Sequence, residues 1–308
     1  MLIDEIIRFC DTSYTAADTR HICSDCQHVK CPGSCKLCLE EIHFPSKYPQ
    51  GKKDYDCQNL INFYVCDYQY KYASEIWYLL RLSQAIQALK AYNVLSIGCG
   101  ACPDLVALES FLTEKGNSDG EISYLGIDVN KRWKPIHQVI ENYQSPYIKK
   151  VHFCYDDAIT YFNAHSVKNA NILILQYVIS HLYNTNQIQQ LDDLYENLIK
   201  NIVLHRNQNK PFVIMINDVN SNNRGRDLFS GLCDKLGNAG LHGYASKYYF
   251  DYRIQNDYQR YGNMHDDNRI LYGPIHDSLK KYEPWEYCSS AQLLIEVKGG
   301  NKDDYKCQ

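Results

Sequence analysis

From residue 93 onward, short apolar runs alternate with amphipathic stretches of helical length. Such runs are typical of strands buried on both faces of a parallel sheet, with the intervening helices covering those faces. We therefore expect an α/β fold with a doubly wound sheet. Strands are expected at residues 94–98, 124–129, 151–155, 171–177, 212–218, 244–252 and 291–297, and helices at 103–115, 131–142, 157–163, 186–204 and 226–239.

The cysteines divide the chain differently, because eight of the 14 lie within residues 1–66. Between residues 23 and 66 there is little hydrophobic periodicity, so this stretch is not expected to fold on apolar burial alone. We expect residues 1–66 to form a short helix and a Cys-rich module, residues 67–92 a connecting helix, and residues 93–300 the α/β domain.

The amino terminus and the lack of a long apolar run favour a cytoplasmic protein. Acidic residues stand where a secretory signal would carry basic ones, and no run approaches the ~18 apolar residues that span a bilayer, so no membrane partner is expected. The net charge of -4 does not favour bulk binding to nucleic acid. In a reducing compartment, clustered cysteines hold metal more often than they form disulfides.

Two Cys-x-x-Cys pairs, at residues 23 and 26 and at residues 35 and 38, have the spacing of a four-thiolate zinc site. Zinc would supply folding energy that a module of this size lacks. Other cysteines can replace one pair or build a second site with His43 or Cys66, so the expected ligands are Cys23, Cys26, Cys31, Cys35, Cys38 and Cys57. An iron–sulfur cluster and disulfides are the alternatives, and residues 31, 35 and 38 also match the cluster spacing of radical S-adenosylmethionine enzymes.

A glycine turn follows the first expected strand. Gly98-Cys99-Gly100 leads into a helix, and Asp128 ends the second strand. Glycines let the backbone approach a ligand, and a carboxylate at that strand end can accept both hydroxyls of a ribose. A dinucleotide fingerprint would place a third glycine where Pro103 stands, which argues against pyrophosphate binding. The plain alternative is a turn between a strand and a helix in some other α/β protein.

Over residues 93–298 the sequence resembles the class I S-adenosylmethionine-dependent methyltransferases. Ser96-Ile-Gly-Cys-Gly-Ala-Cys-Pro103 is similar to their first motif, Gly126-Ile-Asp128 to the second, residues 155–158 to the adenine-contacting segment and residues 173–182 to the fourth-strand segment. The resemblance implies a seven-stranded Rossmann-like sheet with an antiparallel last strand, and S-adenosylmethionine as the cofactor. The donor contacts it implies are Gly98, Cys99, Gly100, Asp128, Val129, Asp156, Asp157, Ala158, Gln176 and Tyr177.

The sequence departs from that family at two positions. Ser96 stands where an acid is common and Cys102 where a third glycine is common, so other groups must hold the amino acid end of the donor. Lys71, Tyr72 and Glu75 on the preceding helix are the candidates. The same departures support an alternative function, in which the chain keeps the fold and binds the donor or assembles with partners without catalysis.

An acceptor with an acidic proton needs a base, and His181 and Asp218 follow the fourth and fifth strands, where an acceptor would lie. The structural alternatives are a helix cap for His181 and bonds to loop amides for Asp218. Residues 176–179 lack the prolines of adenine amino methyltransferases, and no Pro-Cys nucleophile for cytosine occurs there. The expected acceptor class therefore stays open among small molecules, RNA and proteins.

Overall fold

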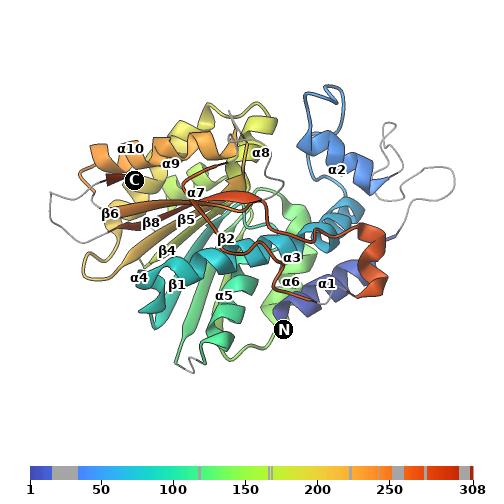
Figure 1. Cartoon of the computed structure of the whole chain (residues 1–308), viewed down its shortest axis with the longest axis horizontal. Coiled ribbons are helices and arrows are strands. Elements are labelled where there is room, and N and C mark those ends of the chain that lie inside the picture. The colour runs from blue at the N-terminus through green and yellow to red at the C-terminus, as the bar shows by residue number, and fades with distance from the viewer. Residues whose placement is uncertain are drawn as a thin grey trace.

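One mixed β-sheet runs through the centre of the structure (Figure 1). The computed structural model describes residues 1–15, 34–116, 119–165, 167, 169–221, 224–241, 243–251, 260–273, 276–297 and 306–307. The main strands follow the spatial order β3-β2-β1-β4-β5-β8-β6. Their bounds are β1 Ala91–Ile97, β2 Glu121–Ile127, β3 Ile148–Cys154, β4 Ile172–Gln176, β5 Phe212–Val219, β6 Gly243–Tyr249 and β8 Ser290–Val297.

This sheet confirms the expected α/β, doubly wound fold. The first five strands pair in parallel, and β8 lies antiparallel between β5 and β6, as the resemblance implied. Two strands of two residues each, β7 (Asn263–Met264) and β9 (Lys306–Cys307), pair with β6 and were not expected. The chain order reverses at β1, which lies between β2 and β4, and ligands of open α/β sheets bind at such a reversal, beyond the carboxyl ends of the strands.

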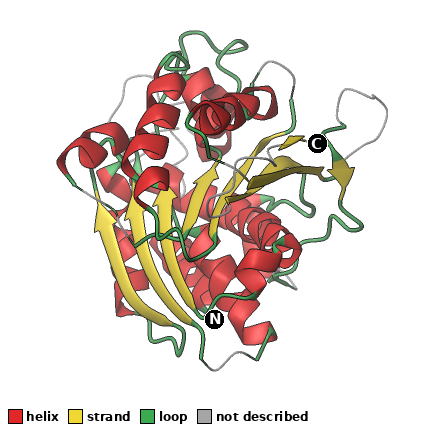
Figure 2. Ribbon diagram, turned by 90° about the vertical axis from the view of Figure 1, so that its left-hand side faces the viewer, coloured by secondary structure: helices red, strands yellow, loops and turns green. Residues whose placement is uncertain are grey.

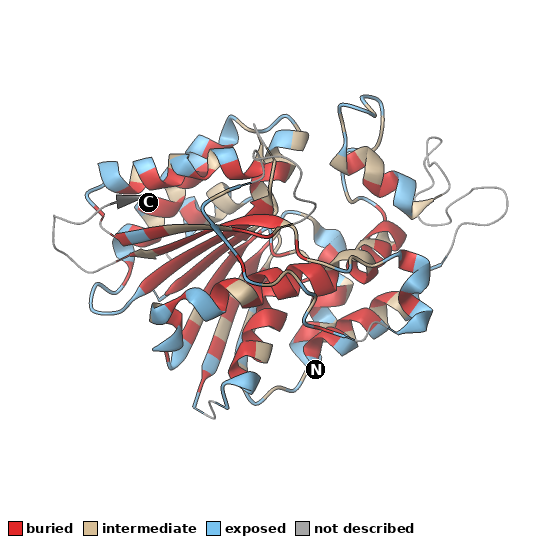
Figure 3. Ribbon diagram, viewed as in Figure 1, coloured by how far each residue is buried: buried red, intermediate tan, exposed pale blue. Residues whose placement is uncertain are grey.

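Helices cover both faces of the sheet (Figure 2). Successive side chains of a strand point to opposite faces, so Ile172 and Ile174 join one buried cluster, whereas Leu173 and Leu175 join the other. Figure 3 shows the central strands as largely buried, whereas the edge strand β3 is mostly exposed or half-buried. The first cluster includes α1 (Leu2–Ser13), α3 (Gln58–Leu82), α5 (Pro103–Glu114) and α6 (Lys134–Asn142), and the second includes α7 (Ala158–Ala164), α9 (Gln190–Asn201) and α10 (Ser230–Asn238).

The amino-terminal helix packs into the main fold. Leu2, Ile3 and Ile6 are fully buried in the cluster that contains α5, and α1 contacts α3, α5 and α6. The expected boundary at residue 66 falls inside α3, which begins at Gln58. The connecting helix also begins and ends earlier than expected. It ends at Leu82, and the Ser83 side chain then caps α4 (Gln84–Gln87) by accepting a hydrogen bond from the Ile86 amide before β1 begins.

The remaining elements lie beside the carboxyl ends of the strands or in the connections. Helix α2 packs against α3 and α8, which brings its residues to the sheet edge where β4 ends. Among the described helices, none combines the length and the apolar character needed to span a membrane. The bounds are α2 Cys35–His43, α8 Val178–Asn184 and the 3-10 helices η1 Lys131–Trp133, η2 Val203–His205, η3 Gly225–Leu228 and η5 Asp277–Tyr282.

Candidate active site

A cavity of about 760 Å³ opens at the carboxyl ends of β1, β2 and β4. Its walls come from the loops after these strands and from α2, α3 and α8. The volume lies in the ordinary range for small-molecule and cofactor sites. The ten donor contacts expected from the sequence all line this cavity, namely Gly98, Cys99, Gly100, Asp128, Val129, Asp156, Asp157, Ala158, Gln176 and Tyr177.

The glycine turn needs its glycines. Gly98 and Gly100 have φ angles of +63° and +49°, in the left-handed region that L side chains rarely adopt. A Cβ atom at Gly98 would also lie 2.8 Å from Cγ2 of Val178, on the far side of the turn. The backbone at this point therefore passes closer to the fourth-strand segment than any other residue type would allow.

Asp128 is held against this turn by two backbone amides. The Gly100 N–H donates to Oδ2 at 3.0 Å and the Asn130 N–H donates to Oδ1 at 2.9 Å. Burial raises the pKa of Asp128, and these two hydrogen bonds oppose the rise because they favour the carboxylate. Each oxygen keeps a lone pair for a ligand.

The segment after β3 contributes two carboxylates with different roles. Asp157 caps α7, accepting a hydrogen bond from the Thr160 amide at 2.9 Å. Asp156 is exposed, and its Oδ1 accepts from the Asp157 amide, 2.9 Å away. Both residues line the cavity, so the helix cap fixes the backbone that carries Asp156 there.

A buried ion pair lies beside the cavity on α3. Lys71 Nζ is 2.8 Å from Glu75 Oε1, and the hydroxyl of Tyr177 donates to Glu75 Oε2 at 2.8 Å. Lys71 and Tyr72 line the cavity, and Glu75 is not among the lining residues and is fully buried. Of the three residues proposed for the amino acid end of the donor, Glu75 therefore orients Lys71 and Tyr177 from behind.

Two buried acceptor atoms have no hydrogen-bond partner among the described residues and belong to side chains that line the cavity. They are Oδ2 of Asp104 and Oε1 of Gln176. Leaving a buried acceptor unpaired costs roughly 1–3 kcal/mol, so such atoms indicate the position of a donor group on a ligand. Asp104 is not among the site residues expected from the sequence, although an acid in the first turn after the glycine turn is a signal for it.

Aromatic rings form another wall of the cavity, which the sequence analysis did not predict. Tyr64, Tyr68 and Tyr72 stand one helical turn apart on α3, with neighbouring ring centres 5.0 and 5.2 Å apart. His43 on α2 contacts the hydroxyls of Tyr55 and Tyr68 at 2.9 and 3.3 Å. We call eight of the lining rings the aromatic wall, namely His43, Tyr55, Tyr64, Tyr68, Tyr72, Trp133, Tyr177 and Trp285.

The two expected bases have different surroundings. His181 lines the cavity on α8, with its ring 6.2 Å from that of Tyr55. Burial lowers the pKa of His181, and the carboxylates of Asp54 and Asp128 oppose that shift, so the imidazole is neutral and able to accept a proton.

Asp218 instead has the structural role that the sequence left open. Its Oδ2 accepts from the amides of Ile179 and Ser180 at 2.9 and 3.1 Å, at the start of α8. It is fully buried and absent from the cavity lining, and burial raises its pKa to about 6 against those hydrogen bonds. These contacts fit the structural alternative, a cap at the start of α8, and the role of base stays a prediction.

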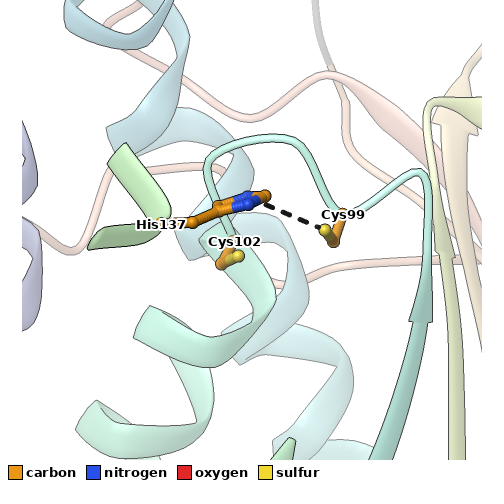
Figure 4. A group of neighbouring side chains, drawn as sticks. All are labelled: Cys99, Cys102 and His137. Carbon is orange, nitrogen blue, oxygen red and sulfur yellow. Dashed lines mark hydrogen bonds between the residues drawn. The ribbon is translucent and has the colours of Figure 1, made fainter. Parts of the chain in front are cut away.

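Three of the expected zinc ligands, Cys23, Cys26 and Cys31, lie outside the described residues. Cys35 and Cys38 lie one turn apart on α2, and Cys57 precedes α3, with Cys38 and Cys57 buried. Within the described part of the chain, the atoms of Cys99, Cys102 and His137 form a group close enough to hold one metal ion (Figure 4). The sequence predicts Cys99 as a donor contact and predicts no metal at this group.

Comparisons with known proteins give distant structural similarity only. Neither the models of protein families nor the curated proteins contain a match to this chain. Among solved structures, a putative class I S-adenosylmethionine-dependent methyltransferase from Listeria monocytogenes is 10% identical with a TM-score of 0.47, covering 99% of this chain and 90% of that chain. The plantazolicin methyltransferase BpumL in complex with SAH is 13% identical with a TM-score of 0.42, covering 85% and 96%. At such distances the similarity transfers no function.

Proposed function

We propose that this chain is an S-adenosylmethionine-dependent methyltransferase, acting on a small molecule, an RNA or a protein. One observation carries the proposal. The glycine turn, Asp128 and the acidic segment after β3 all line one cavity at the reversal point of the sheet. The glycine turn allows the backbone to approach a nucleoside donor, Asp128 suits its ribose, and the acidic segment suits its adenine.

The residues present fit the nucleoside half of that donor. Each oxygen of Asp128 has a lone pair left to accept a ribose hydroxyl. Asp156 offers a carboxylate to the exocyclic amine of adenine. At Gly100 a Cβ atom would be 3.6 Å from the Trp133 ring, so the backbone of the turn packs close against that ring at the cavity wall.

The amino acid end of the donor fits the unpaired acceptors. Oδ2 of Asp104 and Oε1 of Gln176 have no partner among the described residues, and each would accept a hydrogen bond from an ammonium group within its reach. Lys71 would pair with the donor carboxylate, while Glu75 holds the Lys71 ammonium group in place. The family's first motif commonly has an acid and a third glycine where this chain has Ser96 and Cys102. In this arrangement, Asp104, Gln176 and Lys71 make the contacts that those two residues would otherwise provide.

The bound donor supplies a methyl group activated on a sulfonium sulfur. The chain aligns the acceptor with that methyl group and excludes water, and the aromatic wall provides the enclosing surface. His181 accepts the acceptor's proton at an imidazole nitrogen. A flat or cationic acceptor would gain most from the aromatic wall.

We further propose that residues 1–66 bind zinc through Cys23, Cys26, Cys31, Cys35, Cys38 and Cys57, with an iron–sulfur cluster as the alternative. The turn between Cys35 and Cys38 on α2 supports this part of the proposal. Metal analysis of the purified chain, with its visible absorption spectrum, distinguishes zinc from iron. Such thiols stay reduced in a reducing compartment, which favours the cytoplasm as the location of this protein.

Calorimetry with S-adenosylmethionine and S-adenosylhomocysteine tests the donor site directly, and transfer of a labelled methyl group to small-molecule, RNA and protein fractions tests catalysis. We expect binding of both ligands and labelling of one fraction. Binding without transfer to any fraction would support the non-catalytic alternative. Absence of binding to either ligand would overturn the proposal.

A further inference from the structure

Two thiols and an imidazole meet beneath the glycine turn (Figure 4). Cys99 and Cys102 flank Gly100 and Ala101 in a Cys-x-x-Cys spacing, and His137 comes from α6. The three ligand atoms lie within 4.8 Å of one another, and Cys99 Sγ is 3.9 Å from His137 Nε2. In a tetrahedral zinc site, ligand atoms lie about 3.5–3.8 Å from one another. Small side-chain movements would therefore bring all three atoms to bonding distance from one zinc ion.

The surroundings select the kind of ion. All three side chains are buried, with exposed fractions of 4%, 0% and 1% for Cys99, Cys102 and His137. Two thiolates and a neutral imidazole balance the charge of a divalent ion, which avoids the cost of a net charge in a buried site. Sulfur and imidazole ligands favour zinc over magnesium or calcium, which prefer oxygen.

Neighbouring residues orient His137 and leave space for the sulfur of Cys99, as a metal site requires. His137 Nδ1 lies 2.9 Å from the Tyr155 hydroxyl, and its ring stacks on Phe153 with centres 3.7 Å apart. A ligating histidine typically donates its other N–H to such a partner, which fixes the ring and its tautomer. Gly126 makes room for the sulfur, because a Cβ atom there would be 2.8 Å from Cys99 Sγ.

We propose that Cys99, Cys102 and His137 form a binding site for one zinc ion that joins the β1–α5 loop to α6. Binding replaces the two thiol protons, which leave to solvent, with two zinc–sulfur bonds. His137 Nε2, now 2.7 Å from the Gly100 carbonyl oxygen, gives up that contact and binds the ion, while its proton moves to Nδ1 and is donated to Tyr155. The remaining coordination position is open to that carbonyl or to water.

Cobalt(II) titration of the reduced, metal-free full chain tests the site, because thiolate-bound cobalt absorbs in the visible and near ultraviolet. We expect C102S and H137Q each to bind one cobalt ion fewer per chain than the unchanged protein. C154S is the matched control, since Cys154 at the end of β3 is not part of the group and its variant should bind the full number. Comparing these variants separates this site from the amino-terminal cysteines, which remain intact in all of them.

Tyr155→Phe provides a second variant that leaves all three ligands in place. Removing the hydroxyl should weaken the affinity for the same cobalt ion by roughly 10–100-fold, without changing the number of ions bound. Circular dichroism identifies any variant that fails to fold. If folded C102S and H137Q bind as many ions as the unchanged protein, or if Cys99 and Cys102 are joined in a disulfide after purification under reducing conditions, the proposal is overturned. These readouts do not depend on methyl transfer, so the zinc site can fail or hold independently of the proposed function.

Discussion

The ammonium of Lys71 and the carboxylate of Glu75 form an ion pair of 2.8 Å on α3, with side-chain exposures of 4% and 0%. Glu75 also accepts from Tyr177, from Asn217 and from the amides of Ser289 and Ser290. One carboxylate thus joins α3 to the ends of β4, β5 and β8, which meet at the cavity. The pair explains how a long helix outside the sheet is fixed relative to the site.

Glu75→Gln should lower the free energy of unfolding by about 3–5 kcal/mol, since it leaves the Lys71 charge buried without its partner. Lys71→Met should cost less, because the Glu75 carboxylate would keep its four other hydrogen-bond donors. Urea unfolding of both variants measures the difference. A loss for Glu75→Gln no larger than that for Lys71→Met would contradict the role given to Glu75.

Asp128→Asn should weaken donor binding by roughly 10–100-fold, because hydrogen bonds to a charged acceptor contribute about 1.5–3 kcal/mol. The amide oxygen can still accept one of the two backbone N–H groups, so the fold should persist. Glu121→Gln is the control, since Glu121 is exposed at the opposite end of the same strand. Calorimetry with S-adenosylhomocysteine checks both, and equal affinities would remove Asp128 from the donor site.

His181→Asn should slow methyl transfer about 100-fold or more while leaving donor affinity unchanged, as expected for loss of a general base. The pH dependence of the transfer rate provides the readout that a structural role would not move. The acidic limb of the unchanged protein should disappear in the variant. His165→Asn, at an exposed position directly after α7, is the control. A rate change with the acidic limb intact would argue for a packing role.

Asp218→Ala should lower the free energy of unfolding by about 1–3 kcal/mol, because it leaves the first amides of α8 without their acceptor. Asp218→Asn keeps an acceptor oxygen and should retain most of the stability and the transfer rate. Thermal unfolding and rate measurements on both variants test the cap. A stable Asp218→Asn protein without transfer activity would support the role of base instead.

The pH dependence of stability should contain a contribution from His43. Burial lowers its pKa from 6.5 to about 4, so the unfolded chain binds one more proton than the folded chain between those pH values. The stabilising contribution is complete above pH 6.5 and is lost as the pH falls towards 4, at up to about 1.4 kcal/mol per pH unit.

Asp218 acts in the opposite direction, because its pKa is raised to about 6, and the two effects offset each other in the unchanged protein. His43→Gln should therefore remove only the His43 part. We expect the stability difference between this variant and the unchanged protein to vary with pH between 4 and 6.5, measured by urea unfolding. A constant difference for His43→Gln would contradict the assignment.

Local patterns were sufficient for the main strands of the sheet and for the glycine turn. Apolar runs at β1 to β6 and β8, and the helices between them, follow from periodicities within single segments, and parallel order follows from the alternation. The turn at Gly98 and Gly100 and the acid at Asp128 are also local, because strand ends in a parallel sheet share one edge. The sequence by itself therefore determined the fold class and placed the cavity.

Contacts between distant segments were decided by the tertiary structure alone. The burial of α1 against α5, the meeting of Cys99 and Cys102 with His137, and the unpaired oxygen of Asp104 depend on how helices pack on the sheet. The capping of α8 by Asp218 depends on the register between β4 and β5. No spacing along the chain encodes these contacts, because each is set by side-chain volume and hydrogen-bond geometry in three dimensions.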